Sequence, residues 1–201
     1  MSKMFIHLPR TGGTFLRVVL EEFGIPHNNH YPVVSLCHSS LTFSTELFTF
    51  GFIRNPYDWY VSRYFYYCRK GVKEKGVSRD NDMGISPGFG KEIKSIYQHI
   101  KLGLESDAPR FWLSDIYDYM YKVDGKLAID YVGKFEDLEN EVRKILGLTR
   151  REFNAVADKH RTANLINASK HQGYLSHLSD ETMRIIYEKD KEIFDEYGYA
   201  S

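Results

Sequence analysis

Short, nearly continuous runs of apolar residues recur along the chain, and stretches with helical periodicity separate them. Apolar runs of this length are typical of strands that are buried on both faces, as in a parallel sheet. We therefore predict strands at residues 4–8, 47–53 and 127–132, and a shorter strand at residues 33–37.

Apolar residues at helical spacing occupy most of the remaining chain. The pattern that follows the first predicted strand stops at Gly24-Ile25-Pro26. After the second long run, Asn55 is a suitable helix cap and Pro56 a suitable first helical residue. The predicted helices occupy residues 15–23, 56–70, 91–104, 109–121, 136–146, 149–158 and 179–197.

This order of elements predicts one α/β domain over residues 1–201, with a mostly parallel sheet flanked by helices on both faces. A chain of this length, 42% of it hydrophobic, is long enough to bury a sizeable core. Residues 71–90 are polar and rich in glycine, and we predict a mobile loop there. Residues 26–35 and 159–176 are predicted loops as well.

Charge and cysteine content narrow the classes of function. Lys and Arg together number 27, as do Asp and Glu, so no overall field favours nucleic acid or an anionic membrane, and neither is an expected partner. Two cysteines are too few for a disulfide scaffold, and no C-x-x-C pair suggests a zinc site. No apolar run approaches the ~18 residues of a membrane span, and no signal peptide precedes the first strand. We expect a soluble, cytoplasmic protein that uses no metal, and the oligomeric state stays open.

The turn after the first strand carries the first candidate chemistry. Its sequence, Pro9-Arg10-Thr11-Gly12-Gly13-Thr14, links the strand to a helix that begins near Phe15. Glycines let the backbone approach an anion, and the helix start offers free N–H groups and positive potential. A tight turn without function is the alternative. The Lys-Ser or Lys-Thr pair of a nucleoside-triphosphate loop is missing.

Other candidates also follow predicted strands or precede helices. Arg54 directly follows the strand at residues 47–53, and His38 directly follows the strand at residues 33–37. Arg161 lies in the loop before the last helix. Ligands of open α/β sheets bind outside the carboxyl ends of the strands. The glycine turn, Arg54 and Arg161 would then share one edge of the sheet and suit a nucleotide with phosphates at two separate places.

These motifs resemble the sulfotransferases that use 3′-phosphoadenosine 5′-phosphosulfate (PAPS), especially the carbohydrate O-sulfotransferase branch. The first motif is the strand–loop–helix with His7-Leu8-Pro9-Arg10-Thr11-Gly12-Gly13-Thr14, and the second is Arg54-Asn55-Pro56 with Ser62 eight residues after the arginine. Softer matches are Glu136-Asp137-Leu138, the basic loop from Lys159 to Lys170, and a tail at Tyr197-Gly198-Tyr199.

The resemblance implies a P-loop-like fold and a role for each matching residue. Residues 10–15 (Arg10, Thr11, Gly12, Gly13, Thr14 and Phe15) would grip the 5′-phosphosulfate. The 3′-phosphate would bind to Arg54 and Ser62, with Arg161 and Thr162 closing over it. The product nucleotide would be 3′-phosphoadenosine 5′-phosphate (PAP). At Arg10 the family usually has lysine. Arginine keeps the charge but is too basic to deliver a proton.

Transfer of a sulfuryl group to an alcohol requires a base that titrates near neutral pH. His38 is our first candidate and His30 the second. The family implies an acceptor hydroxyl on a carbohydrate; a peptide tyrosine or a small alcohol or phenol is an alternative. Two other functions stay open: a nucleotide kinase with an aberrant phosphate loop, and a nucleotide-binding module without activity.

Overall fold

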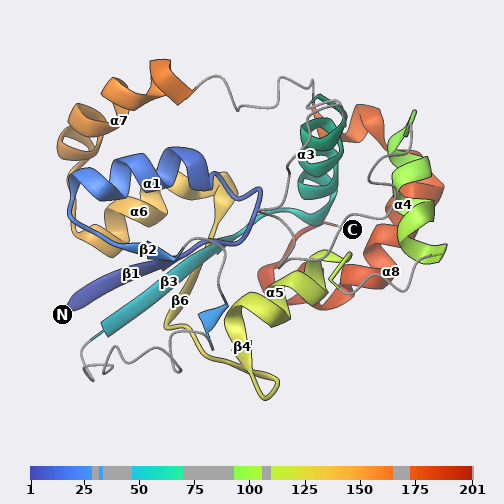
Figure 1. Ribbon diagram of the computed structural model, residues 1–201, viewed down its shortest axis with the longest axis horizontal. Helices are drawn as coiled ribbons and strands as arrows, with labels where there is room; N and C mark the ends of the chain where they lie inside the picture. Colours follow the sequence, from blue (N-terminus) through green and yellow to red (C-terminus); the bar gives the residue numbers. More distant parts are fainter. Residues whose placement is uncertain (29–31, 34–46, 70–92, 106–109, 165–172, 201) are drawn as a thin grey trace, which may run out of the picture. The chain divides into compact units, whose positions relative to one another are not determined.

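The computed structural model describes residues 1–28, 32–33, 47–69, 93–105, 110–164 and 173–200, and for residues 28, 67–69 and 161–164 the backbone alone (Figure 1). The chain divides into two compact units. The first comprises Met1–Arg54 and Asp118–Ala168, and the second Asn55–Tyr117 and Ser169–Ser201. A single domain over residues 1–201 stays a prediction.

A parallel sheet forms the centre of the first unit. Its strands are β1 (Ser2–Ile6), β2 (His27–Asn28), β3 (Leu47–Ile53) and β6 (Tyr131–Lys134), in the order β2-β1-β3-β6. Every pairing among them is parallel. The α/β fold with a parallel sheet is therefore confirmed, and β3 has the predicted bounds.

Two strands depart from the prediction. β2 lies in the predicted loop at residues 26–35, where Phe5 N–H donates to the Pro26 carbonyl at 3.0 Å. The strand predicted at residues 127–132 begins late, because Leu127 instead pairs in an antiparallel ribbon of β4 (Lys122–Val123) and β5 (Lys126–Leu127). The predicted strand at residues 33–37 lies outside the described residues apart from Val33.

The Asp130 side chain fixes where β6 begins. Its carboxylate accepts from the N–H of Thr49 at 2.7 Å and from the Thr49 hydroxyl at 2.8 Å. Asp130 N–H returns a bond to the Thr49 carbonyl at 3.0 Å. The ladder with β3 then starts at the next pair, Phe50 with Tyr131.

Helices α1 (Gly13–Glu22), α6 (Leu138–Leu146) and α7 (Arg150–Asn164) cover one face of this sheet (Figure 1). Full burial of a phenylalanine or leucine contributes about 1.5–3 kcal/mol, so this layer stabilises the unit. The buried core between sheet and helices consists of Phe5, Leu16, Val19, Leu20, Phe50, Phe52, Val142, Phe153 and Ala157.

The opposite face of the sheet receives Tyr121, the last residue of α5 (Leu113–Tyr121). Gly51 alternates with the core residues Phe50 and Phe52, so it faces the other way. A Cβ atom on Gly51 would lie 2.3 Å from the Tyr121 hydroxyl oxygen, which shows how closely the ring approaches the strand.

The second unit is helical. It contains α3 (Pro56–Arg69), α4 (Ile96–Glu105), most of α5, the 3₁₀ helix η4 (Tyr174–His177) and α8 (Asp180–Tyr197). The helix starts follow their caps. Ser95 Oγ accepts from Gln98 N–H at 3.1 Å, so α4 begins after Ser95 rather than at residue 91. Asn55 caps α3 as predicted, its side chain accepting from Tyr57 N–H at 2.9 Å.

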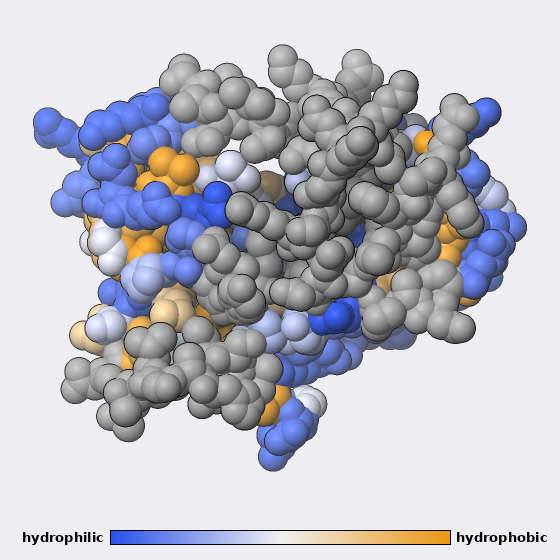
Figure 2. All heavy atoms as spheres, in the orientation of Figure 1, coloured by the Kyte–Doolittle hydropathy of each residue, from blue (hydrophilic) through white to orange (hydrophobic). Residues whose placement is uncertain are grey.

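Few large apolar side chains are exposed on the described surface. They are Met1, Leu104, Leu127 and Leu175, which come from separate elements. Hydrophilic residues accordingly cover most of the described surface in the view of Figure 2. None of the helices within the described ranges is long and apolar enough to cross a membrane.

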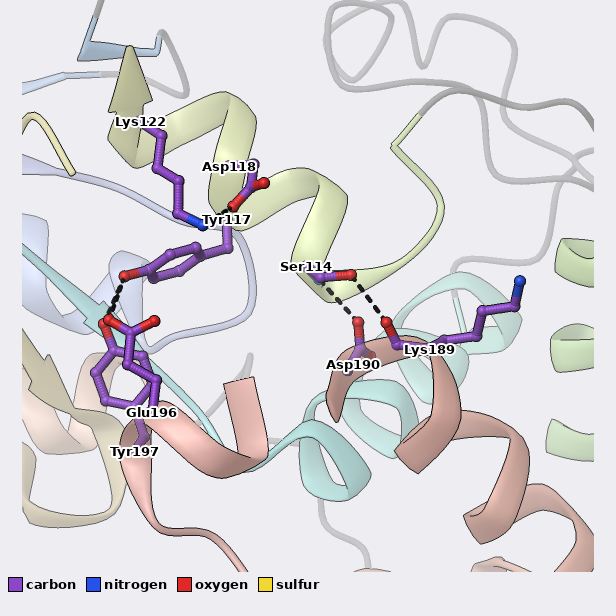
Figure 3. Close-up of polar contacts among 8 residues, drawn as sticks. All are labelled: Ser114, Tyr117, Asp118, Lys122, Lys189, Asp190, Glu196 and Tyr197. Atoms are coloured by element: carbon purple, nitrogen blue, oxygen red, sulfur yellow. Dashed lines mark hydrogen bonds and ion pairs between the residues drawn. The ribbon is translucent and has the colours of Figure 1, made fainter. Parts of the chain in front are cut away.

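A buried carboxylate connects three helices of the second unit. Asp190 interrupts the regular geometry of α8, with φ −108° and ψ 21°. It accepts from the Tyr60 hydroxyl at 2.7 Å and from Ser114 N–H, at the start of α5, at 2.8 Å (Figure 3 shows the bond to Ser114). The Tyr60 hydroxyl in turn accepts from Leu113 N–H at 3.0 Å.

This network predicts a pH-dependent stability. Burial raises the pKa of the Asp190 carboxyl to about 6, above its ordinary value. The folded state therefore binds this proton more tightly than the unfolded chain does. The resulting stabilisation is fully present below pH ~4 and is lost as the pH rises through the folded pKa; it amounts to about 2–3 kcal/mol.

Asp190→Asn removes this titration and keeps an oxygen that can accept from Ser114. In urea unfolding between pH 4 and 7, we expect the free energy of unfolding of the wild type, minus that of the variant, to fall as the pH rises. Asp195→Asn, an exposed carboxylate on the same helix, controls for the change in charge. Parallel profiles for wild type and Asp190→Asn would contradict this account.

Candidate functional site

The order of the strands places a switch point between β1 and β3. The chain continues from β1 to β2 on one side, and β3 lies on the other side. The β1–β3 ladder ends at the pair Phe5–Phe50, one residue before the end of β1. In open α/β sheets, ligands bind outside the carboxyl ends of the strands at such a point. The glycine turn follows β1 there, and Arg54 follows β3.

A buried hydroxyl bridges the two strands beyond the end of this ladder. The Tyr121 hydroxyl accepts from Phe52 N–H at 3.1 Å. It also lies 3.2 Å from the Phe52 carbonyl and 3.3 Å from the Ile6 carbonyl. The ring of Tyr121 is fully buried. This hydroxyl satisfies polar groups of the two strands at the point where their mutual pairing stops.

The glycine turn has the backbone of an anion-binding loop. Arg10 and Gly12 have positive φ angles, 67° and 76°. The buried Thr11 donates through its hydroxyl to the Leu8 carbonyl at 2.6 Å. No side chain in the described part of the molecule caps the N-terminus of α1, whose N-cap residue is Gly12. The N–H groups of Gly13 and Thr14 lie ahead of the first bond within the helix, which Leu16 N–H donates to the Gly12 carbonyl.

At each glycine of the turn, a different neighbouring ring leaves no room for a Cβ atom. A Cβ on Gly12 would lie 2.8 Å from the ring of Phe135, and the φ angle of Gly12 already disfavours other residues. A Cβ on Gly13 would lie 1.7 Å from Nε2 of His7. His7, 7% exposed, therefore packs directly against the start of α1.

The side chain of Arg54 contacts the glycine turn. Its Nη1 donates to the Arg10 carbonyl at 3.1 Å. Its guanidinium carbon lies 4.5 Å from the centroid of the Phe135 ring. Arg54 is only 8% exposed, so its charge lies in a partly dehydrated place beside the N-terminus of α1. A guanidinium next to the positive end of a helix favours anions, above all phosphates.

The remaining predicted residues are not all in described parts of the chain. Ser62 lies on α3 in the second unit and is 1% exposed. His38 and His30 lie outside the described residues. The roles assigned to residues 10–15, Arg54, Ser62 and the two histidines therefore stay predictions, although the structure brings the backbone of the turn and Arg54 together.

Arg161 and Thr162 are not in a loop. The predicted helix end near residue 158 was too early, because α7 continues to Asn164. His160, one residue before Arg161, contacts Glu22 at 3.3 Å. Glu22 ends α1, about 14 Å from the glycine turn by the rise of the helix. The structure thus holds the backbone of Arg161 near the far end of α1, and its role at the nucleotide stays a prediction.

Sequence reasoning missed two residues of this region, Phe135 and Tyr121. Phe135 directly precedes the matching Glu136-Asp137-Leu138, and that position was the available signal. Tyr121 is the last residue of the helix predicted at residues 109–121, and nothing in the pattern distinguishes its hydroxyl from those of other tyrosines. Among the described residues, no group of three or more His, Cys, Asp or Glu could hold a metal ion.

Comparison with known proteins identifies the fold. No family model matches the chain, and no curated protein matches its sequence. Among solved structures, the chain is similar to the mouse sulfotransferase SULT7A1 complexed with PAP. The TM-score is 0.57 at 15% sequence identity, over 99% of this chain and 89% of that chain. The chain therefore has the fold of a sulfotransferase.

The close packing of His7 on Gly13 should contribute to the free energy of unfolding. Gly13→Ala forces a methyl group into the imidazole, and we expect a loss of about 1–3 kcal/mol in the free energy of unfolding. His7→Ala in the same chain opens the space. The double variant should therefore lose less than the sum of the two single losses.

Urea denaturation measures all three variants. Gly173→Ala is the control, because a Cβ there meets nothing within 4 Å. Additive losses for Gly13→Ala and His7→Ala would show that the two residues do not contact each other.

Proposed function

We propose that this protein is a sulfotransferase that moves a sulfuryl group from PAPS to an acceptor hydroxyl. The bond from Arg54 to the Arg10 carbonyl is the observation that carries the proposal. It joins a turn suited to one phosphate to a cation suited to another, at the switch point of the sheet. The similar mouse structure, a sulfotransferase complexed with PAP, supports the same ligand.

Each phosphate of the donor has a proposed site. The N–H groups at the start of α1 and the side chain of Arg10 hold the 5′-phosphosulfate. Arg54 and Ser62 hold the 3′-phosphate, and the spacing of eight residues between them matches the family motif. Arg161 and Thr162 close over the nucleotide, which requires the end of α7 to leave its place beside Glu22.

In-line transfer accounts for the remaining roles. The acceptor oxygen forms a bond to sulfur while the bond from sulfur to the 5′-phosphate oxygen breaks, and His38 takes the hydroxyl proton. Negative charge grows on the leaving PAP, and Arg10 with the amides of the turn stabilises it there. Arginine supplies charge at this position but no proton. The transfer proposed here requires no metal ion.

The acceptor is proposed from the resemblance alone. A hydroxyl of a carbohydrate is the first choice, with His38 ahead of His30 as the base. We also propose a cytoplasmic location, because two cysteines are typical of ordinary thiols in a reducing compartment.

Transfer of labelled sulfuryl groups to carbohydrate acceptors tests this function. We expect PAPS-dependent labelling without magnesium. His38→Ala should lower turnover by about 10²-fold or more, since general bases contribute about 10²–10⁴-fold. The same variant should bind PAP as the wild type does, because His38 touches the acceptor and not the nucleotide.

His30→Ala is the matched control and should keep turnover. Equal activity of His38→Ala and wild type would remove His38 as the base. Transfer of a phosphoryl group from ATP with magnesium, and none from PAPS, would favour the kinase. Binding of PAP without any transfer would favour a module that lacks activity.

A further inference from the structure

Phe135 contacts both phosphate motifs. It begins the 3₁₀ helix η2 (Phe135–Asp137), directly after β6, and its side chain is half-buried. Its ring centroid lies 4.5 Å from the guanidinium carbon of Arg54. Its Cε2 atom lies 2.8 Å from the place where a Cβ on Gly12 would be. The same ring therefore contacts Arg54 of one motif and closely approaches Gly12 of the other.

The two described contacts of the Arg54 guanidinium constrain it in different ways. The Arg10 carbonyl accepts from Nη1 and so fixes one direction within the guanidinium plane. The Phe135 ring lies against the guanidinium, with its centroid 4.5 Å from the guanidinium carbon, so it restricts the tilt of that plane and uses no N–H donor. The five N–H donors of an arginine all lie in this plane. The tilt therefore determines where these donors can meet a phosphate.

We propose that Phe135 is a positioning residue for the 3′-phosphate: it holds the plane of Arg54 in the orientation that binds this group. The proposal rests on the proposed function, because it assumes that Arg54 binds a phosphate.

Two nucleotides separate this role from general effects on the site. PAP carries the 3′-phosphate, and adenosine 5′-monophosphate (AMP) lacks it. Phe135→Leu removes the aromatic face but keeps an apolar side chain. We expect this variant to bind PAP about 5- to 30-fold more weakly in calorimetry, the range expected for a cation–π contact in a partly dehydrated place. Its affinity for AMP should change by less than about twofold, because AMP lacks the 3′-phosphate that Arg54 would bind.

A double-mutant cycle tests whether Phe135 acts through Arg54. In an Arg54→Ala background, Phe135→Leu should cause no further loss of PAP affinity. Phe135→Tyr keeps the aromatic face and should bind PAP as tightly as the wild type does. Phe48→Leu, at another half-buried phenylalanine of the same unit, is the matched control and should leave PAP binding unchanged.

Pentafluorophenylalanine at position 135 provides a second test if Phe135→Leu fails to fold, because it keeps the shape of the ring and removes its negative face. It should weaken PAP binding and spare AMP binding. Equal losses for PAP and AMP would overturn the proposal, since the ring would then act on the nucleoside. Additive losses in the cycle would overturn it as well. If the wild type bound no PAP, the proposed function itself would fail.

Discussion

The hydrogen bond from the Arg54 guanidinium to the Arg10 carbonyl is the contact on which the candidate site depends. β1 and β3 pair from Ser2–Leu47 to Phe5–Phe50, and their mutual ladder then ends. Beyond that point Tyr121 satisfies backbone groups of both strands, and Arg54 reaches back to the turn after β1. A buried arginine requires polar partners. This bond supplies one and links the segments that follow the carboxyl ends of the two central strands.

The turn reaches this arrangement through several steric conditions that support one another. Positive φ at Gly12, the ring of His7 against Gly13 and the ring of Phe135 against Gly12 leave little freedom at these positions. Arg10 also adopts a positive φ, which is uncommon for a residue with a side chain and costs of order 1 kcal/mol. Strain of this kind often marks functional sites, and here it turns the Arg10 carbonyl toward Arg54.

Much of this fold could be predicted from the sequence, since long apolar runs have few alternatives. β3 is such a run and has its predicted bounds. β2 was missed because its two residues, His27 and Asn28, are polar and carry no pattern. β6 starts late because the Asp124-Gly125 turn directs Leu127 into a ribbon with Lys122.

Site residues that belong to a sequence motif could be predicted. Residues that join the site only through a contact in the folded structure could not. The glycine turn and Arg54 are visible in the sequence, but the bond between them is not. An aromatic residue after a strand is indistinguishable from core in a sequence, so Phe135 was missed. The end of α7 has no apolar period, and a contact between His160 and Glu22 accompanies the extra helical turn.

The central claim is that the glycine turn and Arg54 hold two phosphates of one nucleotide. A crystal structure of the complex with PAP tests it most directly. The account predicts the 5′-phosphate at the N–H groups of Gly13, Thr14 and Phe15, and the 3′-phosphate at the Arg54 guanidinium, which stays in contact with the Phe135 ring. A nucleotide bound elsewhere, or with its 3′-phosphate away from Arg54, would contradict it.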